Sequence, residues 1–563
     1  MLMMKRMHAA ILAGATAALA LALPAQQKSS TWSPGIPPHT PEAAAAEKAA
    51  EEAWFAHLQF LASDELKGRR TGTPEFLRAA AYVEEQFKSI GLKPAGVQGF
   101  RQEVAFRRAR VEAEKSSLAL ETASGQTVLF KVGEGVQLSP NAKGEVRLDA
   151  PAIFVGHGLV IPGLGIDDLK GVDLKGKIAV ILGSAPAAVR GPLKAYYRTT
   201  ASRWPALKKA GAVGVVSILE PRPVPAGQSA SSGLHAAGAA AAWAARGVDQ
   251  LADPELDPLS GSKLNATFTP ARAEELLAAS GHTLAELRAA EEHDLPLPKF
   301  PLAGTLHAVS VTEVLATYTA PNVVAVLEGT DPLLRRQYLT LTAHLDHLGE
   351  GRAVEGDAIY NGAMDNAAGI ASLIEVAKVL AAHRPRRSIL FLALTGEEEG
   401  ELGSQYYARY PTVPRASIAA ELNMDMYLPL FPLHYLEVQG LGESTLGNDA
   451  RAAAQLNGIE VQFDKQPDEN RFIRSDQASF VKYGIPAINF KFGWIPDSPE
   501  QKIFNDWIRN RYHHPNDDLQ QPIDRGGAVL FDRVLLTIIQ RVANATARPA
   551  WYPESFFSTV VRR

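Results

Sequence analysis

The most regular part of this chain reads YLTLTA at 338–343, DNAAGIASLIEVAKVLAAH at 365–383 and SILFLAL at 388–394. The first and third segments are short apolar runs, which are typical of buried strands. In the middle segment, five apolar side chains recur at helical spacing: Ile370, Leu373, Ile374, Ala377 and Leu380. A strand, a helix and a strand in this order predict an α/β fold with a mixed, mostly parallel sheet and helices on both faces.

The same pattern continues on both sides, with further strands expected at about 321–328, 418–424, 435–439 and 485–491. In open α/β sheets, the functional site lies beyond the carboxyl ends of the strands. Four acidic or histidine side chains fall at such ends: His344, Glu397, Glu398 and Asp425. We therefore expect these side chains to converge at one edge of the sheet.

Five short segments each carry an acidic or histidine residue just past an expected strand or at the start of the helix. They are HLDHLG (344–349), NGAMDNAAG (361–369), TGEEEGELGS (395–404), LNMDM (422–426) and RYHHPNDD (511–518). The chain has no cysteine, so any zinc must be held by imidazoles and carboxylates. These segments supply enough of both for two metal ions with a shared ligand, and leave one carboxylate as a base.

Each of these residues also has a plainer interpretation. Asp365 stands where a carboxylate caps a helix, and Asp425 would suit a buried salt bridge. The neighbours Glu397 and Glu398 repel each other unless a cation or a proton separates them, which favours one as ligand and the other as base. The pair His513 and His514 leaves open which imidazole binds.

Composition narrows the class of protein. The 563 residues suit two or three domains, and 46% hydrophobic with 21% charged residues describe a folded soluble chain. A net charge of −4 offers no basic field for nucleic acid, so nucleic-acid binding is not expected. The absence of cysteine excludes a cysteine nucleophile, disulfides and a lipid-anchored cysteine.

The amino-terminal region indicates export. Lys5 and Arg6 precede an Ala-rich apolar stretch, which is typical of a signal peptide over residues 1–25. A membrane anchor is the alternative, but the stretch is short and weakly apolar for a span. We therefore expect a periplasmic or secreted protein without a stable membrane span after cleavage.

The rest of the chain divides by composition. Residues 26–48 are predicted to be a Pro-, Ser- and Ala-rich linker, and 49–110 the first part of a catalytic domain. Residues 111–315, called the predicted insert below, should be mainly β with some helix. No segment there has the spacing of a ligand set, so a non-catalytic role is expected. The main catalytic part is expected at 316–550 and a tail at 551–563.

At this point the motifs resemble a known family. HLDHLG, NGAMDNAAG, GEEEGELGS, NMDM, RSDQASFVKYGIPA and YHHPNDD are similar to those of the co-catalytic di-zinc aminopeptidases of peptidase clan MH, family M28. Its relatives include glutamate carboxypeptidase II, the transferrin receptor and glutaminyl cyclase. GVDLKGKIAVIL and ALKKAGAVGVVSI in the predicted insert resemble a protease-associated domain. The resemblance implies the zinc-exopeptidase fold.

The resemblance also implies a ligand set for two zinc ions. Asp365 would bridge both ions. His344 and Asp425 would complete one site, and Glu398 and His513 would complete the other, so the family pattern chooses His513 over His514.

Three further residues receive catalytic roles from the resemblance. Glu397 matches the general base, Asp346 an acid that orients a ligand imidazole, and Tyr512 a donor to the oxyanion. Gln477 departs from the pattern, since many relatives have histidine there, but that position is not a ligand.

The expected function is an exported zinc aminopeptidase that acts on peptides with a free N-terminus. Within the family, a carboxypeptidase or a glutaminyl cyclase is the alternative, and Arg471 and Arg474 are candidates to hold a terminal carboxylate. A non-catalytic binding protein is a further alternative, disfavoured because every ligand residue is present. A serine hydrolase is not supported, because the chain has no GxSxG motif.

Overall fold

The computed structural model describes residues 40–142, 144–189, 191–220, 246–467 and 471–560. The predicted signal peptide lies outside the described residues. Helix α1 (Pro41–Leu61) begins inside the segment predicted to be a linker, so that prediction is wrong from residue 41 onward. The hydroxyl of Thr40 accepts the backbone N–H of Ala43 at 3.2 Å, and proline is well suited to the first helical position. Within the described part of the chain, no helix combines the length and apolarity needed to cross a membrane.

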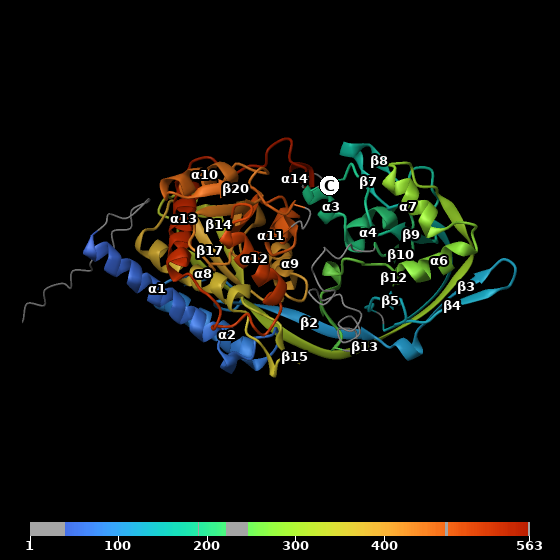
Figure 1. The fold of residues 1–563 in the computed structure, drawn as a ribbon, viewed down its shortest axis with the longest axis horizontal. Helices are drawn as coiled ribbons and strands as arrows, with labels where there is room; N and C mark the ends of the chain where they lie inside the picture. Colours follow the sequence, from blue (N-terminus) through green and yellow to red (C-terminus); the bar gives the residue numbers. More distant parts are fainter. Residues whose placement is uncertain (1–39, 143, 190, 221–245, 468–470, 561–563) are drawn as a thin grey trace, which may run out of the picture. The chain divides into compact units, whose positions relative to one another are not determined.

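The sheet that carries the site is mixed, as predicted (Figure 1). Its strands in spatial order are β2 (Arg101–Val111), β13 (Phe300–Leu327), β17 (Ser388–Leu394), β14 (Tyr338–His344), β18 (Ile418–Asn423), β21 (Ala487–Phe492), β19 (Tyr435–Gln439) and β20 (Glu460–Gln462). The four central strands β17, β14, β18 and β21 are parallel. Their carboxyl ends therefore lie at one edge of the sheet.

Helices cover this sheet. They are α1, α2 (Pro74–Ile90), α8 (Ala368–Ala382), α9 (Leu402–Arg409), α10 (Leu446–Leu456), α11 (Gln477–Val481), α12 (Pro499–Asn510) and α13 (Arg525–Asn544). Helices α8 and α13 pack against β14, α11 packs against β18 and β21, and α1 lies along α8 and α13 (Figure 1). Every residue of β17 and β18 is buried, so both faces of these strands are covered.

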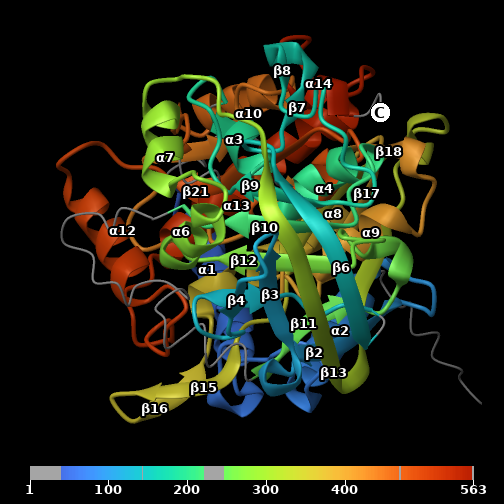
Figure 2. The same cartoon turned by 90° about the vertical axis from the view of Figure 1, so that its right-hand side faces the viewer.

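Strand β13 crosses the predicted boundary between residues 315 and 316. The sequence indicated a strand from about 321, but the strand begins at Phe300 and runs for 28 residues. Its first part pairs with β3 (Ser117–Thr122) and β6 (Glu145–Phe154), which belong to the predicted insert (Figure 2). Side chains alternate between buried and partly exposed over much of this part, because one face is covered.

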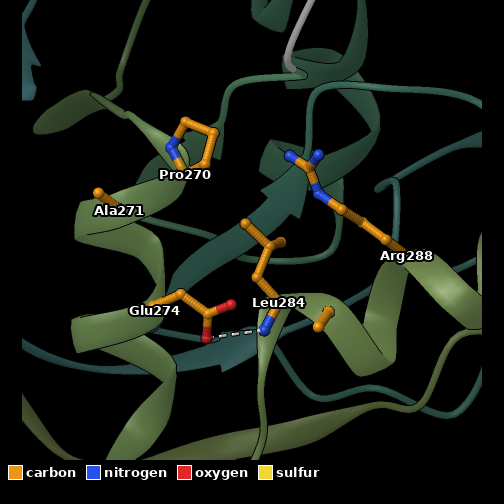
Figure 3. A pocket seen from close by; sticks show the side chains of 6 residues that line it. Pro270, Ala271, Glu274, Leu284 and Arg288 are labelled. Atoms are coloured by element: carbon orange, nitrogen blue, oxygen red, sulfur yellow. Dashed lines mark hydrogen bonds between the residues drawn. The ribbon is translucent and has the colours of Figure 1, made fainter.

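The predicted insert contains a second set of strands and several short helices, as its sequence indicated. The strands are β4 (Thr127–Phe130), β5 (Val136–Leu138), β9 (Ile178–Leu182), β10 (Gly214–Ile218), β11 (Val248–Leu251) and β12 (Leu264–Phe268). The helices include α4 (Thr200–Lys209), α6 (Pro270–Ala278) and α7 (Leu284–Glu292). The Glu274 carboxylate of α6 accepts the backbone N–H of Leu284 at 3.0 Å, which joins α6 to the start of α7 (Figure 3).

The described part of the predicted tail is packed rather than free. Residues 557–560 form the short helix α14, and Phe557 is buried against Phe472 and Ala487. The Nε1 of Trp551 donates to the carbonyl of Gly484 at 2.9 Å.

Candidate metal centre

Two groups of potential metal ligands lie beyond the carboxyl ends of the parallel strands. The first contains His344, Asp365 and Asp425, and the second contains His347, Asp365 and Glu398. Within each group, one ligand atom per residue lies within 4.8 Å of the others. His344 ends β14, Asp425 follows β18 and Glu398 follows β17, so the parallel order of the strands brings them together.

Asp365 lies between two imidazoles. Its Oδ1 is 3.2 Å from His344 Nε2, and its Oδ2 is 3.3 Å from His513 Nε2. His344 Nε2 is also 3.3 Å from Asp425 Oδ1, and His513 Nε2 is 3.1 Å from Glu398 Oε2. The two oxygens of one carboxylate thus face two separate sets of ligand atoms, which is the arrangement of a bridging ligand.

The backbone at Asp365 differs from the sequence-based expectation. Asp365 and Asn366 do not have helical φ and ψ angles, and regular helix α8 begins only at Ala368. Asp365 therefore does not act as an ordinary helix cap. Instead, the Nδ2 of Asn366 donates to the Met424 carbonyl at 2.8 Å, which joins this turn to the segment that carries Asp425.

His347 belongs to the site, although the sequence analysis assigned it no role. Its Nδ1 is 2.6 Å from Glu398 Oε1, and its side chain is fully buried. This short contact does not have the angles of a hydrogen bond, so among the residues that the structure describes neither ring nitrogen of His347 nor Glu398 Oε1 has a hydrogen-bond partner. The available signal was the second histidine of HLDHLG, but a loop sequence does not tell which way its side chains point. Buried imidazole and carboxylate atoms without partners fit a metal ion.

Asp346 makes contacts other than the expected one. It is the backbone carbonyl of Asp346 that lies 3.1 Å from His344 Nδ1, whereas the carboxylate is 4.0 Å from that nitrogen. The carboxylate accepts the backbone N–H groups of Glu397 at 3.2 Å and Glu398 at 3.3 Å. Because β14 and β17 are parallel neighbours, the residue after one strand reaches the loop after the other. Asp346 therefore positions the acidic loop directly.

The charges of the site shift the pKa values of its groups strongly. Burial raises the pKa of Glu397 well above its usual range, and the nearby Asp425 and Glu398 raise it further. Burial acts to raise the pKa of Glu398, but His513 and His347 outweigh it and lower this pKa to about 2. Burial acts to lower the pKa of His513, but Glu398 and Asp365 outweigh it and raise this pKa to about 10. Buried carboxylates this close together repel each other unless cations or protons lie between them, which fits a metal centre.

Two buried charged residues hold the turn that carries Asp365, and the sequence analysis identified neither. Arg69 is fully buried and donates to backbone carbonyls only: those of Leu61, Leu345, Asn361, Gly362 and Asp365. Asp517 accepts the backbone N–H of Met364 at 2.9 Å and of Asp365 at 3.0 Å. No local pattern marks these contacts, because the partners are far apart in the chain.

Tyr512 and His513 lie together at the metal centre, where His513 contacts Asp365 and Glu398. Their rings stack with centroids 3.9 Å apart. Burial and the charges of Asp365, Glu398 and Glu397 raise the pKa of Tyr512 well above its usual range, so its hydroxyl stays protonated and is able to donate. Neither His513 nor His514 belongs to the two ligand groups found in the described part of the chain, but His513 Nε2 contacts Asp365 and Glu398.

Comparison with known proteins gives matches over part of the chain. Residues 322–539 match the model of peptidase family M28. The chain is 40% identical over 107 residues to a probable zinc metalloprotease of Pyrenophora teres f. teres, covering 19% of this chain and 22% of that protein. It is 26% identical over 204 residues to aminopeptidase Y of Saccharomyces cerevisiae, covering 35% of this chain and 34% of that protein. The matched part thus spans well under half the length of these relatives.

Among solved structures, an aminopeptidase from Aneurinibacillus sp. strain AM-1 is 22% identical with a TM-score of 0.47. A zinc aminopeptidase from Bacillus subtilis is 18% identical with a TM-score of 0.42. Each alignment covers 89% of this chain and 96% of the other.

Proposed function

Because residues 322–539 belong to peptidase family M28, we propose that the protein is a di-zinc aminopeptidase that hydrolyses the first peptide bond of peptides with a free N-terminus. One observation carries this proposal. The two oxygens of Asp365 lie 3.2 and 3.3 Å from two different imidazoles, each of which has a further carboxylate beside it.

His344 and Asp425 would hold one zinc ion. Glu398 would hold the other together with His513 or His347, and Asp365 would be shared by both. The choice between the two histidines is open, because His347 lies 2.6 Å and His513 lies 3.1 Å from Glu398. Bound zinc would supply Lewis acidity, which polarises a substrate carbonyl and acidifies a water.

The chain's own residues supply the proton transfers. Glu397 is half-buried beside the ligands, and its raised pKa suits a group that takes a proton and then passes it to the leaving amine. Asp346 fixes the loop of Glu397 through two backbone N–H groups. The protonated hydroxyl of Tyr512 would donate to the negative oxygen that forms on the substrate.

A carboxypeptidase is the second candidate, because cationic side chains lie beside the site. Lys491 is buried, and its Nζ donates to the carbonyl of Met426 at 3.0 Å, next to Asp425. Burial, aided by the charge of Arg471, lowers the pKa of Lys491 to about 8. Such groups would hold the terminal carboxylate of a peptide.

The test uses the zinc-reconstituted protein with aminoacyl arylamides and with N-blocked peptides that have a free carboxyl end. Cleavage of the arylamides supports the aminopeptidase, whereas cleavage of the blocked peptides alone would show a carboxypeptidase. Glu397→Gln should keep its zinc and lose about 10²–10⁴-fold in turnover. Glu401→Gln, in the same acidic run, is the control and should remain active. A protein that binds no zinc under these conditions would refute both candidates.

We also propose that residues 1–25 direct export to the periplasm or the medium. Amino-terminal sequencing of the protein from the extracytoplasmic fraction should then begin near residue 26, and full-length protein confined to the cytoplasm would contradict this.

A further inference from the structure

A chain of buried ion pairs joins the predicted insert to the acidic loop of the site. Arg70 donates to Glu399 Oε1 from Nε at 3.0 Å and from Nη2 at 2.8 Å. The same Nη2 lies 3.1 Å from Asp249 Oδ2, and Asp249 accepts three further hydrogen bonds from Arg108, at 3.0, 3.2 and 2.9 Å. The side chains of Asp249 and Glu399 are 0% and 5% exposed. Water therefore screens these pairs little, unlike surface pairs.

Arg70 and Glu399, which pair with each other, are each next in sequence to residues of the metal centre. Arg70 directly follows Arg69, which holds the carbonyls around Asp365. Glu399 directly follows Glu397 and Glu398, the proposed base and ligand. The Arg70–Glu399 pair thus ties the turn that carries Asp365 to the loop that carries the base.

The acidic loop is held at successive residues. Gly396 and Gly400, which flank it, have φ angles of +67° and +106°, a backbone region that glycine adopts without strain. Asp346 holds the loop at its beginning through the N–H groups of Glu397 and Glu398. Glu399 is the next residue, and its side chain is held by Arg70.

Asp249 is the carboxylate that two arginines of this group share. Arg70 pairs with Asp249 and Glu399, Arg108 pairs with Asp249, and the charge of Arg246 also acts on these groups. Asp249 arrives from β11, whose register places it opposite Arg108 of β2. Without its charge, two guanidinium groups would be left with one carboxylate, and Arg70 would no longer be held from both sides.

We propose that Asp249 of the predicted insert is a positioning residue, which acts through Arg70 and Glu399 to keep Glu397 and Glu398 in place. The predicted insert would then contribute to catalysis rather than being a separate module. This inference rests on the proposed function for its activity readout, but not for its zinc readout.

The experiment compares Asp249→Asn with the unaltered full-length protein. For an aminoacyl arylamide, kcat should fall about 10–100-fold with little change in KM, and the zinc dissociation constant from chelator competition should rise by a similar factor. Asp249→Glu, which keeps the charge, should recover part of both losses. Glu313→Gln is the control, because it removes the Arg110–Glu313 pair of 2.8 Å on neighbouring strands β2 and β13 and should change neither quantity.

A second variant guards against loss of folding. Glu399→Gln removes the other partner of Arg70 and should give the same phenotype, and the double variant should be clearly less impaired than the two single effects combined. Normal kcat and normal zinc affinity in Asp249→Asn, or strictly additive effects in the double variant, would refute the proposal. If the unaltered protein cleaved no arylamide, the proposed function would fail, while the zinc measurements would still decide the role of Asp249.

Discussion

Replacing Arg69 by methionine should damage the metal centre as well as the fold. Methionine keeps an unbranched chain of similar reach but has no N–H groups to donate. Arg69 is fully buried, and burial lowers its pKa only to about 10, so it is charged at neutral pH. The hydrogen bonds to Leu345, Gly362 and Leu61 measure 2.8, 2.7 and 3.0 Å, and a further close contact reaches Asn361.

The magnitude follows from these contacts. A buried acceptor left without its donor costs about 1–3 kcal/mol. Four close carbonyls therefore give a loss of at least about 4 kcal/mol, and the longer contact to Asp365 at 3.4 Å adds little. Total stabilities of about 5–15 kcal/mol allow the variant to fold, but with a much reduced margin. Because the freed carbonyls belong to the turn around Asp365, zinc affinity should also fall, by about 10–100-fold.

Arg387→Met is the matched control. Arg387 is equally buried and also donates to backbone carbonyls, but at the end of α13: those of Val542, Ala545, Thr546 and Ala547. Urea unfolding of the metal-free proteins should show a comparable loss of stability for both variants. Chelator competition should show weaker zinc binding for Arg69→Met alone. Equal zinc affinities in the two variants would refute the role assigned to Arg69.

Four other changes test the remaining assignments. Tyr512→Phe should lower kcat by about 10²–10³-fold, as expected for loss of an oxyanion donor, while bound zinc measured by atomic absorption stays constant. His513→Gln should weaken zinc binding in a chelator titration, whereas His514→Gln should not, and the reverse order would contradict the assignment. Removal of zinc by a chelator should abolish peptidase activity and lower the melting temperature, and added zinc should restore both. Burial, aided by the charge of Arg203, lowers the pKa of His157 to about 4, so the folded protein resists protonation and loses stability as the pH falls from about 6.5 to 4. Between pH 7 and pH 4.5 this loss of stability amounts to about 2 kcal/mol, and His157→Gln should remove it from the difference between urea unfolding at the two pH values.

Local patterns were sufficient to predict the α/β class and the edge of the sheet that carries the site. The apolar runs at 338–343 and 388–394 reflect burial on both faces, which favours apolar residues at nearly every position of a strand. The resemblance to a peptidase family was recognisable from local motifs as well, and residues 322–539 match the model of peptidase family M28. Its motifs keep particular residue types at set distances from strand ends, as with His344 and Asp425.

Other features depended on contacts between segments that are distant in the chain. Three features depend on which loops become neighbours when the sheet assembles. They are the orientation of His347, the hydrogen bonds from Arg69 to backbone carbonyls, and the contact of the Asp346 carboxylate with the acidic loop. The early start of β13 depends on its pairing with strands of the predicted insert. The polarity of each residue reflects how buried its side chain is, so the fold class and the strand ends can be predicted from the sequence. Hydrogen bonds between groups hundreds of residues apart leave no such pattern in the sequence, and only the tertiary structure decides them.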